Sequence, residues 1–454
     1  MKGMEKGMDT SLKIKLSSKN LLLKIWTSVG LMIFTSLYTI VDSLFVSNYI
    51  NTTALAGINI AFPLITLIDA FIFMMASGGV AWVSIKIGAG EKEKANHDFS
   101  LIVYFGLFIT IFFVCLALPS LDSLVKFLGA KDPELFGYTK DYLLLILLLD
   151  PFFMLQIIFQ QFLFVEGKGK FALILTLSSG LTNIFFDYLF IVVLNLGIQG
   201  AALGTGAGYC VSTLFAGIFF IRNKKGLHLT KPSRNFSVIR GTMSNGLSEM
   251  VTNLSTSLTT FYLNYLTLKY LGSAGVAAIS IIFYCQFLFS SIFFGFSIGS
   301  APLIGFGWGS QEYDYTKKLL KLCVKLVLIF SLTMFIIAFT GAEIITQFFC
   351  RPDNPVYGIT THGLRLFSLS FLFSGISIFA SSAFTALGDG RRSAILSFVR
   401  VFVLTLFFLT VFPLLLGVDG IWLAIPAAEI TMVAIDVFFL GQLAKRLNVL
   451  QQAK

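Results

Sequence analysis

The residues most able to do chemistry in this sequence are a few acids that interrupt long apolar runs. They are Asp42, Asp69, Asp150, Asp187, Glu249, Glu429 and Asp436. A charged side chain at the centre of a lipid bilayer costs about 2.5–3.5 kcal/mol on insertion scales, so each acid needs a partner, a water-filled cavity or a function. Most of them are expected well inside apolar helices, whereas Glu249 is expected near a helix start, and Asp150 and Asp436 nearer helix ends.

Two of these acids have a hydrogen-bonding residue one helical turn before them. Tyr38 precedes Asp42 by four residues, and Asn183 precedes Asp187 by four, so each pair shares a helix face. A carboxyl group in a low-dielectric environment favours its neutral form, and a second carboxyl nearby strengthens this preference. Such groups suit the uptake and release of a proton during a working cycle.

Hydrogen bonding to a neighbouring helix is the alternative role for every acid in the set. It is the preferred interpretation for Asp69, Glu249 and Glu429, whose function the sequence does not determine. The chain has no Walker sequence, so an ion gradient is the expected energy source. The five cysteines are scattered and are interpreted as packing residues, and neither a metal centre nor an organic cofactor is predicted.

The elements that position these acids are predicted to be membrane-spanning helices. The chain has 454 residues, of which 56% are hydrophobic and 12% charged, and its mean hydropathy is +0.86. Apolar runs long enough to cross a hydrocarbon core of about 30 Å recur from near Leu21 to near Leu443. We therefore predict an all-α integral membrane protein with twelve transmembrane helices, the first of them retained as a signal anchor.

The basic residues indicate membrane topology instead of nucleic-acid binding. The formal charge is +10, but lysines and arginines lie in short loops and tails such as 86–94, 222–240 and 391–392. Alternate loops, near 47–51 and 195–199, contain none. The positive-inside rule then predicts cytoplasmic termini and an even number of crossings.

Similar punctuation recurs at an offset of about 220 residues, as in an internally duplicated transporter. "EGKGK" at 166–170 corresponds to "LGDGR" at 387–391, and "LGIQGAAL" at 196–203 corresponds to "LGVDGIWL" at 416–423. Six crossings per copy give both copies the same orientation. We predict two pseudo-symmetric lobes of six helices.

The predicted boundaries follow from this duplication. The N-terminal lobe spans 1–221 and the C-terminal lobe 241–454, joined by a basic cytoplasmic linker at 222–240. Pro302, within a glycine-rich apolar segment of the second lobe, is a candidate hinge.

Three segments resemble multidrug and toxin extrusion (MATE) exporters, most closely the branch with DinF-like and MepA-like members. They are "SLYTIVDSLFVSNYINTTALAGINIAFPL" at 36–64, "GLTNIFFDYLFIVVLNLGIQGAALGT" at 180–205 and "APLIGFGWGSQEYDYTKK" at 301–318. The resemblance implies an N-lobe site where a proton or sodium ion is exchanged for a drug. The residues it implies for this site are Asp42, Tyr38, Asn183, Asp187, Thr205 and Gln160.

The chain also departs from one branch of that family. NorM-like members have acids in their seventh and tenth helices, but the tenth helix here has none around Ile376 and Ser377, and Glu249 lies too early in the seventh. Sodium coupling through a C-lobe site is therefore not expected.

The resemblance implies a proton-coupled multidrug antiporter that works by alternating access, not an enzyme. Its expected partners are small-molecule drugs and dyes, often cationic, and membrane lipid, and it is expected to act as a monomer in the bacterial cytoplasmic membrane. Alternatives are a sodium-coupled drug antiporter and a flippase for lipid-linked precursors. The flippase would need several basic residues inside the spans, whereas Arg365 and Arg400 are expected near span ends. A membrane prenyltransferase would need a second acidic cluster, which the sequence lacks.

Overall fold

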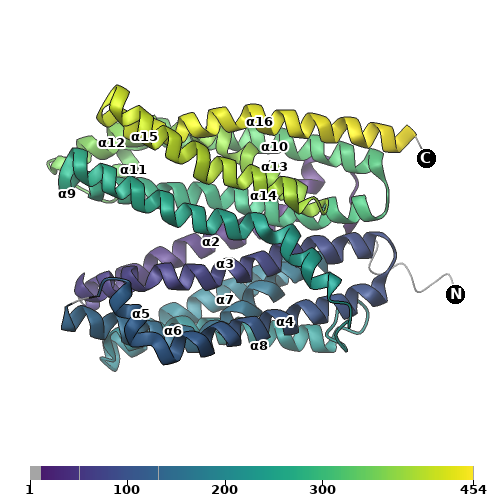
Figure 1. The fold of residues 1–454 in the computed structure, drawn as a ribbon, viewed down its shortest axis with the longest axis horizontal. Coiled ribbons are helices and arrows are strands. Elements are labelled where there is room, and N and C mark those ends of the chain that lie inside the picture. Colours follow the sequence, from purple (N-terminus) through teal and green to yellow (C-terminus); the bar gives the residue numbers. More distant parts are fainter. Residues whose placement is uncertain (1–11, 51, 131, 453–454) are drawn as a thin grey trace.

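The computed structural model of the chain describes residues 12–130 and 132–452 except residue 51, and within these ranges it contains helices and no strands. The first group comprises α2 (Ser18–Tyr49), α3 (Thr52–Gly88), α4 (Lys92–Ala117), α5 (Leu121–Phe127), α6 (Pro133–Val165), α7 (Gly169–Asp187) and α8 (Gly197–Arg222). The second comprises α9 (Ser237–Gly309), α10 (Tyr313–Thr340), α11 (Ala342–Gln347), α12 (Pro355–Ser368), α13 (Phe371–Ala386), α14 (Gly390–Phe398), α15 (Thr405–Leu416) and α16 (Val418–Gln452). Figure 1 shows them as two layers of roughly parallel helices, with both termini at one end.

The helices account for the twelve predicted crossings. Within the described ranges, ten helical segments are long and apolar enough to span a membrane, and α12 and α13, bent by 51° at their junction, form an eleventh. The twelfth is the first half of α9. This 73-residue helix would be about 110 Å long if straight, but it is interrupted at Gly272, whose φ is 64°. The predicted all-α membrane fold is confirmed.

The chain reverses direction within α9, because both of its ends contact α3. A Cβ atom added to Gly246 would lie 1.9 Å from the carbonyl oxygen of Met74, and one added to Gly309 would lie 1.9 Å from that of Ile85. The first half of α9 is too polar to pass the hydropathy test. Many of its Ser and Thr hydroxyls instead bond to the carbonyl one turn earlier, as Thr252 does to Ser248 at 2.8 Å. The polar side chains are thereby satisfied inside the helix, as a lipid environment requires.

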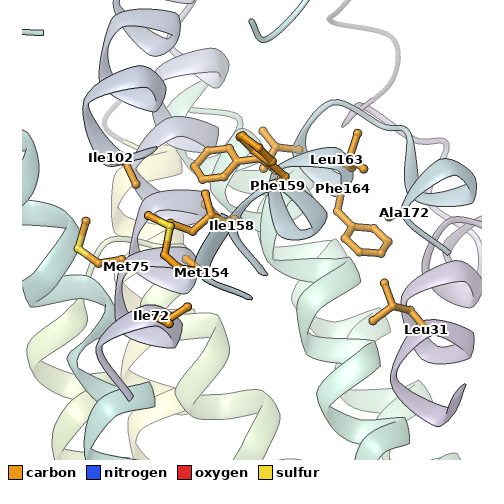
Figure 2. Packing of buried hydrophobic residues seen from close by; sticks show 14 of the residues in the cluster. Leu31, Ile72, Met75, Ile102, Met154, Ile158, Phe159, Leu163, Phe164 and Ala172 are labelled. Carbon is orange, nitrogen blue, oxygen red and sulfur yellow. The ribbon is translucent and has the colours of Figure 1, made fainter. Parts of the chain in front are cut away.

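The core of the first layer is a continuous cluster of aliphatic and aromatic side chains. Figure 2 shows part of it, with Ile72 and Met75 of α3 near Met154 and Ile158 of α6, and Ile102 of α4 above them. This packing fixes the position of α3 relative to α6, and both helices carry acids.

The segment between the two groups of helices is bound to the first group. The backbone N–H of Leu227 donates to Glu166 at 2.8 Å, and the N–H of Thr230 donates to Ser100 at 2.8 Å. Asn223 also donates to Glu166, at 3.0 Å. The predicted linker at 222–240 thus includes this bound segment and the first four residues of α9.

The two layers make their closest contacts at the end where the termini lie. Besides Gly246 and Gly309, Gly295 of α9 approaches the backbone of Val29 so closely that an added Cβ would lie 2.6 Å from its Cα. Lys13 also pairs with Glu312 at 2.6 Å. Towards the opposite end, α3 and α9 carry exposed aromatic side chains, with Phe62 60% and Phe261 76% exposed.

We predict that Gly246→Val opens the terminal end. The valine side chain overlaps the Met74 carbonyl, so the backbones of α3 and α9 cannot approach. Cysteines placed at Lys13 and Glu312, with the native cysteines replaced, should cross-link severalfold less in this variant. Gly441→Val is the control, because an added Cβ there meets no atom within 4 Å. Equal cross-linking in both variants would contradict the proposed contact.

Candidate cation-binding site

The site begins where α2 lies against α7. Gly180 permits this approach, because a Cβ there would lie 2.6 Å from the Phe34 ring and 3.1 Å from the Tyr38 ring. One turn further along both helices, the side chain of Asp42 forms hydrogen bonds with those of Asn183 and Asp187. The structure thus brings together Tyr38, Asp42, Asn183 and Asp187, which the sequence analysis proposed as one site.

The oxygens of this site need a proton or a cation. Asp187 is 0% and Asn183 3% exposed. With both acids ionised, Asp42 Oδ1, Asn183 Oδ1 and both carboxylate oxygens of Asp187 are buried without a hydrogen-bond donor. A carboxyl group can donate to another only when it carries a proton. One proton shared by Asp42 and Asp187 therefore accounts for their hydrogen bond and neutralises one of the two charges.

Helix α8 covers the site through small residues. The side-chain amide of Asn183 donates to Thr205 Oγ1 at 3.4 Å, which places Thr205 beside the acids. A Cβ on Gly204 would lie only 2.1 Å from Asp187 Oδ1. A larger residue at this position would displace the carboxyl group.

Asp187 stands at a change in helix type. It ends α7 and is followed by a π-helical segment, η2 (Tyr188–Val193). Such segments in α-helices are frequent at functional sites. The sequence gave no signal for this feature.

Two other residues from the sequence analysis lie elsewhere. Gln160 donates to Ser212 at 3.3 Å and lies ten residues beyond Asp150 on α6, a rise of about 15 Å. Pro302 is buried in the second half of α9, between Gly299 and Gly305, which contact α2 and α3 respectively. Its role as a hinge stays a prediction.

Tyr142 belongs with the site, although the sequence analysis did not select it. This α6 side chain is buried, and its hydroxyl interacts electrostatically with Asp42, Asp187 and Asp69. No motif marks it, because the contact joins helices distant in the sequence.

The second layer contains a different arrangement of buried charge. Arg400 Nε donates to Glu429 Oε1 at 2.9 Å and to Oε2 at 3.1 Å. Ser377 donates to Asp436 Oδ2 at 2.6 Å. Arg400 lies within a second π-helical segment, η3 (Val399–Leu404), between α14 and α15.

Three expected depths are therefore wrong. Arg400 lies inside the span Gly390–Leu416 instead of near its end, and Asp436 is fully buried near the middle of α16. Asp150 lies at the middle of α6 and is also buried. These helices extend well beyond their apolar runs, so position within a run does not give depth. Glu249 lies partly buried on the first half of α9.

The pattern of two matched halves is also present in the family comparison. The family model described as MatE matches residues 28–189 and again 250–411, so the second match begins 222 residues after the first. The chain belongs to the MatE family. Members of this family are transporters, which excludes the enzyme alternative. The recurring match agrees with the offset of about 220 residues found in the sequence.

Individual relatives are distant but similar over their full length. The chain is 26% identical over 419 residues to the multidrug export protein MepA of Staphylococcus haemolyticus, covering 91% of each protein. It resembles a MATE crystal structure in complex with MaL6, with a TM-score of 0.91 and 21% identity over 98% of this chain and 100% of the other. The outward-facing conformation of a multidrug resistance MATE family transporter gives a TM-score of 0.90 at 22% identity, covering 99% of both chains. These likenesses confirm the two-lobe fold of twelve helices.

We predict that Glu429→Gln strongly destabilises this transporter, because it leaves the Arg400 charge buried without its partner. Breaking a buried ion pair by removing one side costs about 3–5 kcal/mol. Thermal unfolding in detergent should show a large fall in midpoint, which the double variant Arg400→Met/Glu429→Met recovers in large part. Asp314→Asn is the control, because its pair with Lys318 is exposed and worth at most about 1 kcal/mol. Equal midpoints for Glu429→Gln and Asp314→Asn would rule out a structural role for the pair.

Proposed function

We propose that the chain is a proton-coupled antiporter that exports amphipathic, often cationic compounds by alternating access. The observation that carries this proposal is the hydrogen bond between the Asp42 and Asp187 carboxyls, which exists only when the pair holds a proton. Export of drugs is the function in the printed names of the MepA relatives, and that substrate class is extended here to this chain.

Helix α2 can link proton binding to movement of the two layers. Asp42 lies towards one end of α2, and Ser28 and Val29, nearer the other end, contact Gly295 of α9. A change of the α2–α7 contact on protonation would be transmitted along a single helix to the closed end. A ligand shifts such an equilibrium only by its different affinity for the two states. We therefore expect the proton and the drug to prefer opposite states.

The contacts at the terminal end support an assignment of this conformation as open away from the termini. Under the positive-inside rule that side is the cell exterior, with both termini in the cytoplasm of a bacterium. The exposed aromatic side chains on α3 and α9, including Phe62 and Phe261, would offer apolar surface to an amphipathic compound.

Sodium is the alternative coupling ion, because Asp42, Asn183 and Asp187 offer the oxygen ligands that hard cations prefer. A flippase for lipid-linked precursors is less well supported. The charge of Arg400 is neutralised by Glu429, so it is not free to hold a pyrophosphate.

The proposal predicts that Asp187→Asn abolishes export without loss of folding. Ethidium efflux from everted vesicles should respond to an imposed pH gradient in the wild type and fall at least tenfold in the variant. Asp314→Asn, an exposed surface change, should retain wild-type efflux. Efflux driven only by a sodium gradient would replace the proton with sodium. No efflux under either gradient, or full efflux by Asp187→Asn, would reject the proposal.

A second variant tests the position of the carboxyl group without removing it. Gly204→Ala should reduce pH-driven efflux at least tenfold, because the new Cβ would lie 2.1 Å from Asp187 Oδ1 and force it away from Asp42. Gly217→Ala on the same helix is the matched control, since its nearest neighbour would be 3.6 Å away. Equal efflux from the two alanine variants would show that the position of Asp187 is unimportant.

A further inference from the structure

A second pair of acids lies in the first layer, on α3 and α6. The rings of Phe73 and Phe153 meet edge to face at 6.3 Å. Nearer the start of both helices, Gly57 packs against Tyr138, whose Cβ would lie 3.1 Å from an added Cβ. The two contacts are about sixteen residues apart on α3 and about fifteen on α6, so the helices run parallel in a constant register.

This register places Asp69 opposite Asp150. Asp69 precedes Phe73 by four residues, and Asp150 precedes Phe153 by three, so both acids lie about one turn before the ring contact. The charges of the two acids also interact electrostatically. The two carboxyl groups thus occupy the same level of neighbouring helices.

Neither acid has the partners that a buried charge needs. Asp150 is 3% exposed, and Asp150 Oδ2 and Asp69 Oδ1 are buried without a hydrogen-bond donor. The next residue, Pro151, lacks an N–H, so the carbonyl of Leu147 loses its helical donor one turn away. Several acceptors therefore converge at mid-membrane with no donor to satisfy them, and a proton supplies one.

The surroundings contain no basic residue that could neutralise the pair. The cationic side chains of the described parts of α3, α4, α6, α7 and α8 lie near helix ends, where Lys86 pairs with Asp98 and Lys140 with Asp122. The groups that face the acids are hydroxyls and other acids. They are Tyr209 from α8, Tyr142 from α6, Asp42 from α2, Asp187 from α7 and Glu249 from α9, with Thr110 the buried polar residue of α4.

The second pair lies at nearly the same depth as the first. On α8, Gly204 contacts Asp187 and Gly206 contacts Leu149. Two residues along a helix span about 3 Å, so Asp150 lies within about one turn of the level of Asp187. Tyr142 interacts with acids of both pairs, and Tyr209 with Asp69 and Asp150.

We propose that Asp69 and Asp150 form a second proton-binding site, which exchanges its proton with Asp42 and Asp187 through the hydroxyl of Tyr142. In this exchange the protonated carboxyl of one pair gives its proton to the Tyr142 oxygen, as the hydroxyl proton of Tyr142 passes to a carboxylate of the other pair. One proton moves, and Tyr142 ends as it began. Binding at this site stands alone, whereas its use in transport rests on the proposed proton-coupled export.

Proton binding is tested without transport. Infrared difference spectra of the purified protein in lipid, recorded between high and low pH, report the C=O stretch of each carboxyl that gains a proton. Asp69→Asn/Asp150→Asn should lose a band that Asp42→Asn/Asp187→Asn retains, and the single variant Asp150→Asn provides a milder change if the double variant is unstable. Asp314→Asn should leave the spectrum unchanged. Identical spectra for the wild type and Asp69→Asn/Asp150→Asn would overturn the site, as would removal of the band by sodium at constant pH.

The link to transport is tested by counting protons. In proteoliposomes, Asp69→Asn/Asp150→Asn should export ethidium with one proton fewer per molecule than the wild type. Tyr142→Phe should keep both infrared bands and slow pH-driven efflux severalfold, whereas Tyr104→Phe, an exposed change on α4, should not. An unchanged proton count or an unaffected Tyr142→Phe would overturn the exchange. A wild type that shows no pH-driven efflux but keeps the band would reject the proposed antiport and leave the binding site standing.

Discussion

Charge within the membrane-spanning part of this protein has to be neutralised locally, and the two halves do so in different ways. In the first half, Asp42 and Asp187 face each other with no cation beside them, so a mobile proton is the natural partner. In the second half, Glu429 is held by Arg400, a fixed partner. A fixed ion pair contributes to structure, whereas an acid neutralised by a mobile ion can respond to a gradient. The duplication thus produced one half suited to coupling and one suited to support.

The family match makes this asymmetry concrete. An offset of 222 residues places Asn264 at the position equivalent to Asp42 and Leu409 at that equivalent to Asp187. Neither can be ionised, so the carboxyl pair was not retained in the second copy. The π-helical segments, by contrast, occur in both halves, after Asp187 and around Arg400. The shared backbone irregularity therefore carries different chemistry in each lobe.

The sequence predicted those features that depend on local spacing. The i, i+4 relations of Tyr38 with Asp42 and of Asn183 with Asp187 are properties of a single helix, and the structure places these residues together. The helical class and the duplication follow from hydropathy and from repeated turns. The polar first half of α9 was counted correctly because the duplication required a partner for α2, although composition alone does not identify it as a span.

Contacts between distant segments were beyond the sequence. The Arg400–Glu429 pair joins two helices, and neither residue carries a signal for the other. Asp150 was expected near a helix end because the apolar run begins late in α6, but the helix itself starts at Pro133. The approach of Asp69 to Asp150 depends on the register of α3 and α6, which glycine and phenylalanine contacts determine.

The segment between the layers has a consequence for how they move. Hydrogen bonds from Asn223, Leu227 and Thr230 hold it on the first layer, so little free chain remains before α9 begins at Ser237. The two layers are therefore joined by a short pivot instead of a long slack tether. A short connection keeps the facing surfaces at a high effective concentration. After each opening the terminal end can close again without a search, and the rate of the cycle is left to the ions and the cargo.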